Sequence, residues 1–366
     1  MATHNVISYP GKPFFAYKYE DQTMVKHEVF KSYFDKWVKI VGHNNRLNFI
    51  DCFGGCGIYD RNGNLYPGSP IIASQIIENN ANSLNRDCCV TILDIDKNCT
   101  DNIPHAFKLF NCNCIYELIN ADFEAYINTE LAELKAEGKT LCPTFFLVDP
   151  YGYKIKIETI KRLMEVNNSE VYFNFMFNAI NRGIGSGKVD NTLDELFGCS
   201  EWRDCQQYHG RDREACIIDL IRNQFKNFSR YVLPYRICFP QIDRTYFYMI
   251  HLTNHIRGCE IMKACFAELN HGKIEYLGKN QNQSFIFDLI ENPVQEISSY
   301  ICNNFTKSRL SFDELLDRMI DTTPYLGKDI SSAVLNLFNT KLANIVRVTS
   351  KRPTSKPTKK DIIEIY

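Results

Sequence analysis

The sequence lacks an excess of charge of either sign, because 42 Lys and Arg residues stand against 43 Asp and Glu residues, for a net charge of −1. This balance excludes a globally basic protein that coats nucleic acid by charge alone. The longest apolar runs, such as residues 145–148 and 216–221, are far shorter than the roughly 20 residues of a membrane span. Residues 1–10 lack a basic start followed by an apolar stretch. We therefore predict a cytoplasmic protein that does not cross a membrane.

Metal-binding and hydrolase motifs are also missing. The 15 cysteines include no Cys-x-x-Cys pair, and an odd number of cysteines argues against a secreted disulfide scaffold. We predict no metal site, and reduced thiols that pack as small apolar side chains. No Gly-x-Ser-x-Gly motif occurs, so hydrolase chemistry has little support.

Strand-like and helix-like runs alternate through the first two thirds of the chain. Apolar runs that predict strands lie at residues 47–52, 89–94, 115–120, 144–149 and 171–177. Helices are predicted after Pro70, at residues 121–135 and at residues 155–165. This alternation predicts a mostly parallel sheet covered by helices. Two aromatic-rich runs, 231–239 and 245–252, predict an antiparallel hairpin at one edge of that sheet.

The composition changes near residue 283, where helical segments without long strands begin. We predict a helical lead-in over residues 1–46, a Rossmann-like domain over residues 47–282 with a helical insertion at about 190–228, and an α+β domain with a two-stranded wing over residues 283–366. Ser311 and Glu314 have the spacing of a helix capping box. A basic stripe without acids consists of Lys341, Arg347, Lys351, Arg352, Lys356, Lys359 and Lys360. A solvated loop and a nucleic-acid contact explain this stripe equally well.

The strongest local signal is a strand that ends in Asp51 and enters a glycine-rich turn. The turn contains Phe53, Gly54, Gly55 and Gly57. Glycines let the backbone approach a ligand closely, but Asp60 stands where the third glycine of a dinucleotide fingerprint belongs, which disfavours NAD. A carboxylate here would repel a pyrophosphate and attract an ammonium group, such as that of S-adenosylmethionine. A glycine turn without a ligand is the alternative.

Two further acids follow the next predicted strands. Asp94 ends the second strand, where an acid in nucleotide-binding sheets bonds the ribose hydroxyls, and Asp96 is the second candidate for that role. Asp122 follows the third strand, where its carboxylate could accept a hydrogen bond from an adenine amino group. Either acid could simply cap a helix. Acids at three successive strand ends are better explained by one shared ligand.

The fourth strand leads into Asp149, Pro150, Tyr151 and Gly152. The lone pair of a base amino group is delocalised into its ring. Such a methyl acceptor needs oxygen acceptors for its N–H groups, and Asp149 and the Pro150 carbonyl could provide them. Tyr151 could stack on a planar group. Asn174 lies in the next strand, which leads into Asn178 and Arg182, and we predict that these three bind substrate together with Lys351 and Arg352.

Taken together, these motifs resemble the three-Cys-motif partner protein family of class I methyltransferase-like proteins. The matching stretches are residues 23–27, 49–57, 67–70, 146–152, 174–182, 196–202 and 246–261. The resemblance implies a Rossmann-like sheet with a reversed last hairpin, a winged-helix-like C-terminal region and a three-cysteine partner protein. Gly54 stands where the family more often has alanine. The single Pro150 departs from the Asp/Asn-Pro-Pro-aromatic motif of nucleic-acid amino-methyltransferases, so adenine methylation does not follow from the resemblance.

We therefore predict an S-adenosylmethionine-dependent methyltransferase that acts on a base amino group of nucleic acid. Two other hypotheses remain open. The chain could be a catalytically silent adaptor or subunit of a three-cysteine partner protein, or it could methylate a small molecule or a peptide.

Overall fold

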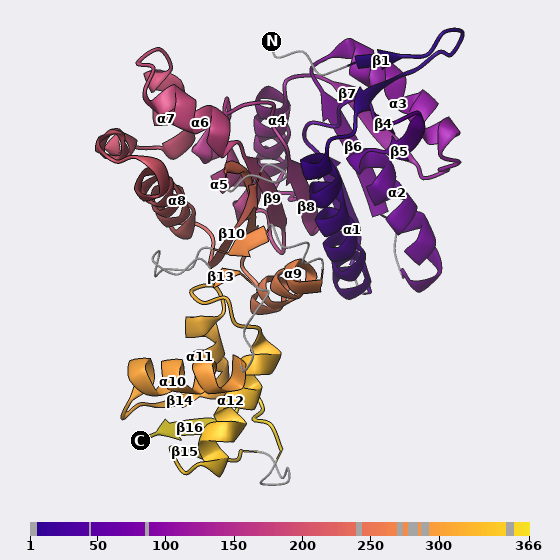
Figure 1. The fold of residues 1–366 in the computed structure, drawn as a ribbon. Helices are drawn as coiled ribbons and strands as arrows, with labels where there is room; N and C mark the ends of the chain where they lie inside the picture. The colour runs from indigo at the N-terminus through magenta and orange to yellow at the C-terminus, as the bar shows by residue number, and fades with distance from the viewer. Residues whose placement is uncertain are drawn as a thin grey trace. The chain divides into compact units, whose positions relative to one another are not determined.

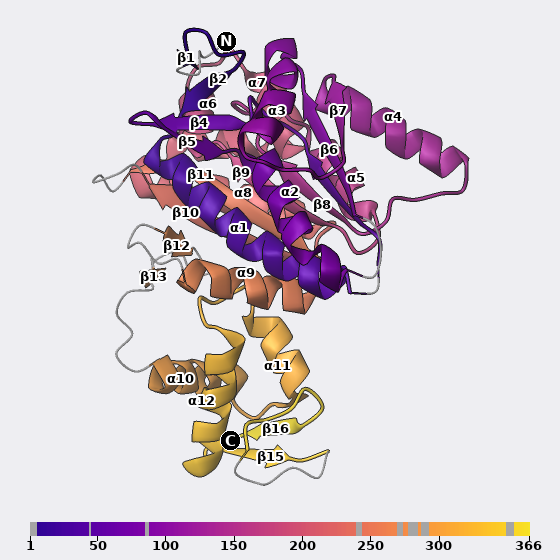
Figure 2. The same ribbon diagram turned by 90° about the vertical axis from the view of Figure 1, so that its right-hand side faces the viewer.

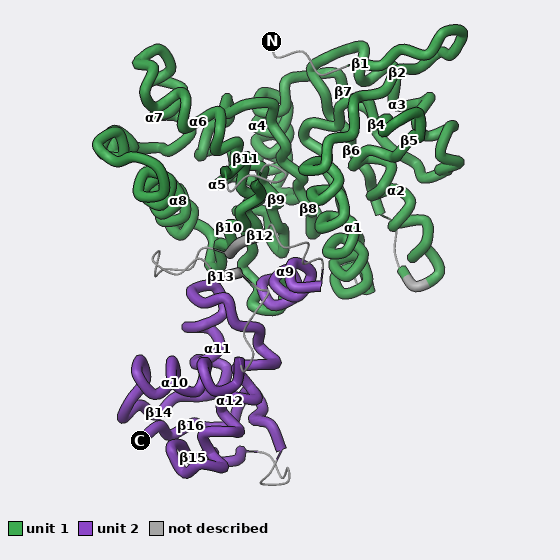
Figure 3. Tube along the Cα trace, in the orientation of Figure 1, with its two compact units in different colours: residues 1–258 green, residues 259–366 purple. Residues whose placement is uncertain are grey.

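The computed structural model describes residues 6–43, 45–84, 88–238, 244–268, 274–276, 285–286, 293–348 and 355–366. The chain divides into two compact units, residues 1–258 and 259–366 (Figure 3). The change in composition predicts the last domain boundary between residues 282 and 283. The observed division lies earlier, within helix α9 (Ile256–Glu268).

A mostly parallel sheet forms the centre of the first unit (Figure 1). Within residues 1–258 its strands are β3 (Leu47–Asp51), β6 (Cys88–Asp94), β7 (Tyr116–Asn120), β8 (Thr144–Val148), β9 (Glu170–Phe175), β10 (Tyr231–Cys238) and β11 (Thr245–Thr253). They follow the order β10-β11-β9-β8-β3-β6-β7, and β11 is antiparallel to both of its neighbours. Strands β8 and β9 are buried along their whole length, as expected for strands covered on both faces. The predicted Rossmann-like sheet with a reversed hairpin is confirmed.

Helices cover both faces of this sheet (Figures 1 and 2). One face carries α1 (Asp21–Val41), α2 (Ser69–Asn80) and α3 (Lys97–Leu109), and the other carries α4 (Phe123–Ala136) and α5 (Ile157–Glu165). Aromatic rings join α1 to the sheet. The ring centroids of Phe34 and Phe49 lie 5.0 Å apart, and those of Trp37 and Phe145 lie 5.5 Å apart. Burial of these large rings fixes α1 beside β3 and β8.

A second, smaller sheet was not predicted. It contains four strands in the order β1-β2-β4-β5, namely β1 (Val6–Ser8), β2 (Phe15–Lys18), β4 (Ile58–Arg61) and β5 (Asn64–Pro67). The prediction of a helical lead-in over residues 1–46 is therefore wrong before α1. Asn62 and Gly63, with φ of 55° and 83°, form the tight turn between β4 and β5. This Asn-Gly pair is a strong hairpin signal that the sequence analysis did not use.

Helices follow β9 where the insertion is predicted. They are α6 (Phe177–Ile184), α7 (Asp190–Phe197), the 3-10 helix η2 (Glu201–Gln207) and α8 (Gly210–Lys226). Cys205 of η2 and Cys216 of α8 form a disulfide, which corrects the expectation that all thiols are reduced. Other buried thiols, such as those of Cys52, Cys56 and Cys99, are outside any disulfide. The two bonded cysteines are 11 positions apart, and only the packing of η2 on α8 brings their Cα atoms to 5.7 Å.

The second unit has helices on a three-stranded antiparallel sheet of order β14-β16-β15. Its elements after α9 are β12 (Ile274–Tyr276), β13 (Phe285–Ile286), α10 (Pro293–Phe305), β14 (Arg309–Ser311), α11 (Phe312–Met319), α12 (Gly327–Asn339), β15 (Ala343–Val346) and β16 (Ile362–Ile365). The predicted capping box is present, with both Ser311 and Glu314 side chains bonded to backbone N–H groups. Lys263 of α9 is fully buried, and its ammonium donates to the carbonyls of Ile320 (2.7 Å) and Thr323 (2.8 Å). These bonds tie Lys263, and with it the part of α9 after residue 258, to the rest of the second unit.

No helix among the described residues is both long and apolar enough to span a bilayer.

Candidate functional site

The candidate site lies where the parallel strands of the first unit end. Strand order reverses at β3, because β6 and β7 lie on one side of it and β8 and β9 on the other. Crevices that bind ligands form at such reversals, beyond the carboxyl ends of the strands. Asp51, Asp94 and Asp149 all lie at this edge, at or directly after the ends of β3, β6 and β8.

Asp51 is the last residue of β3 and is 0% exposed. Its Oδ1 accepts a hydrogen bond from the Phe53 N–H (3.3 Å). Its Oδ2 is buried and accepts no hydrogen bond within the described part of the chain. Burial raises the pKa of Asp51 to about 7, although hydrogen bonding from the Ser69 side chain and the Phe53 N–H lowers it. A buried carboxylate oxygen without a donor is costly, and a cationic N–H donor would relieve that cost.

The glycine-rich turn is held closely against β6. The Gly54 N–H donates to the Leu93 carbonyl (2.8 Å), and a Cβ at Gly54 would lie only 2.5 Å from the Ile92 side chain. Gly55 and Gly57 have φ of 60° and 71°, which side-chain-bearing residues rarely adopt. The turn therefore needs its glycines for local geometry. Asp51, which precedes this turn, is buried.

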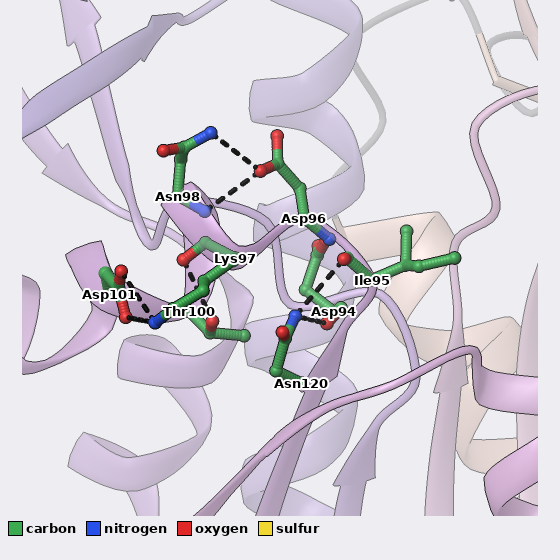
Figure 4. A network of polar contacts seen from close by, with 8 residues as sticks. All are labelled: Asp94, Ile95, Asp96, Lys97, Asn98, Thr100, Asp101 and Asn120. Atoms are coloured by element: carbon green, nitrogen blue, oxygen red, sulfur yellow. Dashed lines mark hydrogen bonds and ion pairs between the residues drawn. The ribbon is translucent and has the colours of Figure 1, made fainter.

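Asp94 organises the neighbouring turn (Figure 4). Its Oδ2 accepts from the Gly55 N–H and its Oδ1 from the Asp96 N–H, both at 2.8 Å. Asn120, the last residue of β7, donates to the carbonyls of Asp94 (2.9 Å) and Ile95 (3.1 Å). Asp94 ends β6, the position at which an acid bonds ribose hydroxyls in nucleotide-binding sheets. Asp96 is exposed and caps α3.

Asp122 and Phe53 lie beside this turn. Asp122 is exposed and caps α4 by accepting from the Ala125 N–H (2.9 Å), which is the structural role that the sequence left open. The Phe53 ring packs at 5.5 Å from Phe123, in the first turn of α4. The start of α4 is thus linked to the glycine-rich turn.

Asp149 has partners that the sequence analysis did not foresee. Its Oδ2 forms an ion pair with Lys26 of α1, and its Oδ1 accepts from the Asn174 amide (2.6 Å). The Lys26 and Asp149 side chains are only 11% and 23% exposed. Burial alone would raise the pKa of Asp149, but the Lys26 charge and the Asn174 hydrogen bond hold it below its ordinary value. Asp149 is therefore a carboxylate held in place by Asn174 and paired with the Lys26 ammonium.

His27 and an aromatic cluster line the α1 side of the site. Burial, with the Lys26 charge as a second cause, lowers the pKa of His27 to about 3, so the imidazole is neutral. Its Nδ1 lies 2.9 Å from the Tyr19 hydroxyl, and its ring lies 5.2 Å from that of Tyr59. Lys26 and His27 were visible in the sequence only as part of a family motif, because nothing local marks a buried lysine.

The predicted substrate residues occupy different environments. Asn174 is buried with its Oδ1 unpartnered, so it supports Asp149 and does not reach the surface. Asn178 accepts from the Arg244 guanidinium (3.1 Å), and Arg182 is exposed. Pro150 is buried, whereas Tyr151 is 55% exposed. Lys351 and Arg352 lie outside the described residues. The described residues contain no group of His, Cys, Asp and Glu that could hold a metal ion.

Three solved structures are similar to this chain at low sequence identity. A Legionella pneumophila protein of family DUF519 has 13% identity and a TM-score of 0.43 over 70% of this chain and 95% of that chain. Trm1 of Pyrococcus horikoshii, solved with S-adenosyl-L-methionine, has 11% identity and a TM-score of 0.37 over 98% and 93%. An O-methyltransferase of Bacillus cereus, solved with SAH, has 12% identity and a TM-score of 0.33 over 61% and 80%.

These TM-scores are all below 0.5, so the fold assignment rests on the strand order of the chain itself. No family model and no curated protein sequence matches the chain.

Proposed function

We propose that this chain is a methyltransferase that uses S-adenosylmethionine. The observation that carries the proposal is the buried, unpartnered Oδ2 of Asp51 beside the glycine-rich turn. The α-ammonium of the cofactor offers the charge and the N–H donors that this oxygen lacks. Asp94 would bond the ribose hydroxyls and Asp122 the adenine amino group, with Phe53, Gly54, Gly55 and Gly57 around the methionine part. When bound, the cofactor supplies a methyl group that is activated for transfer.

The acceptor that we propose is a base amino group of nucleic acid. Asp149 keeps free lone pairs on both oxygens, and with the Pro150 carbonyl it would accept the two amino N–H groups while Tyr151 stacks on the base. A base inside a duplex could not reach this edge, so it would be flipped or single-stranded. We further propose that the chain is a three-Cys-motif partner protein, as its motifs suggest.

The second unit would recruit the nucleic acid. Its order of helix, strand, two helices and two strands, with sheet order β14-β16-β15, supports a winged helix. Within the basic stripe Arg347 is committed to Asp361 (2.9 Å), whereas Lys356 and Lys360 form no ion pair within the described part of the chain. The exposed lysines, with Lys351 and Arg352, would contact phosphates.

A transfer assay tests this function. S-adenosylmethionine with a tritiated methyl group is incubated with single-stranded RNA and DNA oligonucleotides of mixed sequence, and label in the nucleic acid is counted. The proposal predicts transfer by the wild type and a loss of about a hundredfold or more in Asp149→Asn, since one positioned acceptor commonly contributes that much. Nucleoside analysis of the product then locates the methyl group.

One observation favours the adaptor hypothesis. Lys26 already occupies Asp149, and a cation there opposes the positive charge that an amino group gains during methylation. If the folded wild type binds S-adenosylmethionine but transfers no label to nucleic acid, small molecules or peptides, the chain is a silent subunit of a partner protein. Restoration of transfer by a three-cysteine partner protein would instead show that the site is completed by that partner.

A further inference from the structure

Three segments far apart in the sequence meet beside the Asp149 end of the site. Tyr153, just after Asp149-Pro150, packs on α6, because a Cβ at Gly183 would lie 3.2 Å from its hydroxyl. Arg244, at the start of β11, donates to Asn178 of α6 at 3.1 Å. We call residues 151–154, α6 with residues 185–188, and residues 244–246 the acceptor rim. The rim adjoins Asp149 because Tyr151 is two residues beyond it.

The rim combines exposed cations with aromatic rings. Its exposed basic residues are Lys154, Arg182, Lys188 and Arg244, and its tyrosines are Tyr151, Tyr153 and Tyr246. Lys154, Arg182 and Lys188 form no ion pair within the described part of the chain. Tyr246 lies within electrostatic reach of both Tyr151 and Arg182. Glu20, the acid that faces Tyr246, is itself paired with Lys18 at 2.7 Å.

We infer that the acceptor rim binds single-stranded nucleic acid. Cations along the rim would contact successive phosphates, and the exposed Tyr151 ring would stack on a base. A duplex hides the faces of its bases, so it would leave these rings unused. The role of this binding rests on the proposed methyltransferase function, because the rim would hold the acceptor strand next to Asp149. It adds a binding surface in the first unit, separate from the basic stripe of the second.

Fluorescence anisotropy with a labelled single strand of about 12 nucleotides tests the inference. Arg182→Ala/Arg244→Ala removes two rim cations. The matched control is Lys108→Ala/Lys135→Ala, two exposed lysines in the last turns of α3 and α4, at the opposite edge of the sheet. We expect the rim variant to bind at least about tenfold more weakly than the control at about 50 mM salt. The slope of log Kd against log salt concentration should also be smaller by about 1.4, because each of the two lost phosphate contacts contributes about 0.7. Tyr151→Ala should also weaken binding about tenfold.

Several outcomes would overturn the inference. The wild type could fail to bind at about 50 mM salt, or the rim and control variants could bind equally well. Binding could instead be lost only in Lys356→Ala/Lys359→Ala/Lys360→Ala of the second unit. Titration of S-adenosylmethionine into the same variants separates the two proposals. A rim that binds nucleic acid in a protein without cofactor binding would refute the methyltransferase and leave the inference standing.

Discussion

Asp51 and Asp149 show how position tunes two carboxyl groups on neighbouring strands. Asp51 is buried next to the glycine-rich turn, and burial raises its pKa to about 7 although hydrogen bonds from Ser69 and Phe53 lower it. Asp149 has the Lys26 ammonium and the Asn174 amide, which together hold its pKa low. Near neutral pH, Asp51 can therefore lose its proton in response to a cationic ligand, whereas the lowered pKa of Asp149 favours its charged form. This division suits one residue to cofactor binding and the other to positioning an acceptor.

Asp51 should make stability depend on pH. Its folded pKa of about 7 exceeds the ordinary 3.8, so the folded state holds a proton that the unfolded chain loses, and stability falls as pH rises through this window. Asp51→Asn has no carboxyl group at this position, so its stability should not show this fall with rising pH. From pH 5 to pH 8, urea unfolding should show the variant gaining on the order of 2–3 kcal/mol relative to wild type. Asp101→Asn, on exposed α3, serves as the control, and equal pH slopes in all three proteins would refute this account.

The Lys26–Asp149 pair should be worth more than a surface ion pair. Lys26→Met leaves a largely buried carboxylate without its cation, and we expect a loss of about 3 kcal/mol in the free energy of unfolding at pH 7. In Lys26→Met/Asp149→Asn the unpaired charge is gone, and most of that loss should be recovered. Urea denaturation measures both variants. A double variant no more stable than Lys26→Met would show that the lysine acts through packing alone.

At the scale of elements, a strand could be predicted where its own residues form an apolar run. Apolar runs marked β3, β6, β8 and β9 within a residue or two, because strands buried on both faces must be apolar throughout. Strands β1 and β2 are short and partly exposed, so they left no such run. The β4–β5 hairpin did leave one sign, the Asn62-Gly63 turn.

The glycine-rich turn gives a test at this scale. Gly57 and Gly63 both have positive φ, but a Cβ at Gly57 would lie 2.9 Å from Ile103, whereas nothing lies within 4 Å at Gly63. Gly63→Ala should cost about 1 kcal/mol from backbone strain alone. Gly57→Ala should cost about 2 kcal/mol more, because it also overpacks the α3 contact. Thermal and urea unfolding of the pair measure the difference, and equal losses would mean that α3 yields to the added methyl group.

At the scale of the whole molecule, the sequence predicted the sheet and the acids at its strand ends, Asp122 among them, but missed what surrounds them. Asp51, Asp94 and Asp149 could be predicted to share an edge because parallel strands place their ends together. The Lys26 partner of Asp149 is 123 positions away, and no local pattern encodes a contact over that separation. The same holds for Arg244, which meets Asn178 across 66 positions. Such long-range pairs appear only once the helices are packed.

The most direct test of the central claim is isothermal titration of S-adenosylmethionine into wild type and Asp51→Asn, with NAD titrated separately. We predict that the wild type binds S-adenosylmethionine and not NAD. Asp51→Asn should bind at least about tenfold more weakly, because a charge-assisted hydrogen bond to the ammonium is worth about 1.5–3 kcal/mol. Absence of binding to the folded wild type, or equal binding by Asp51→Asn, would contradict the cofactor site proposed at the end of β3.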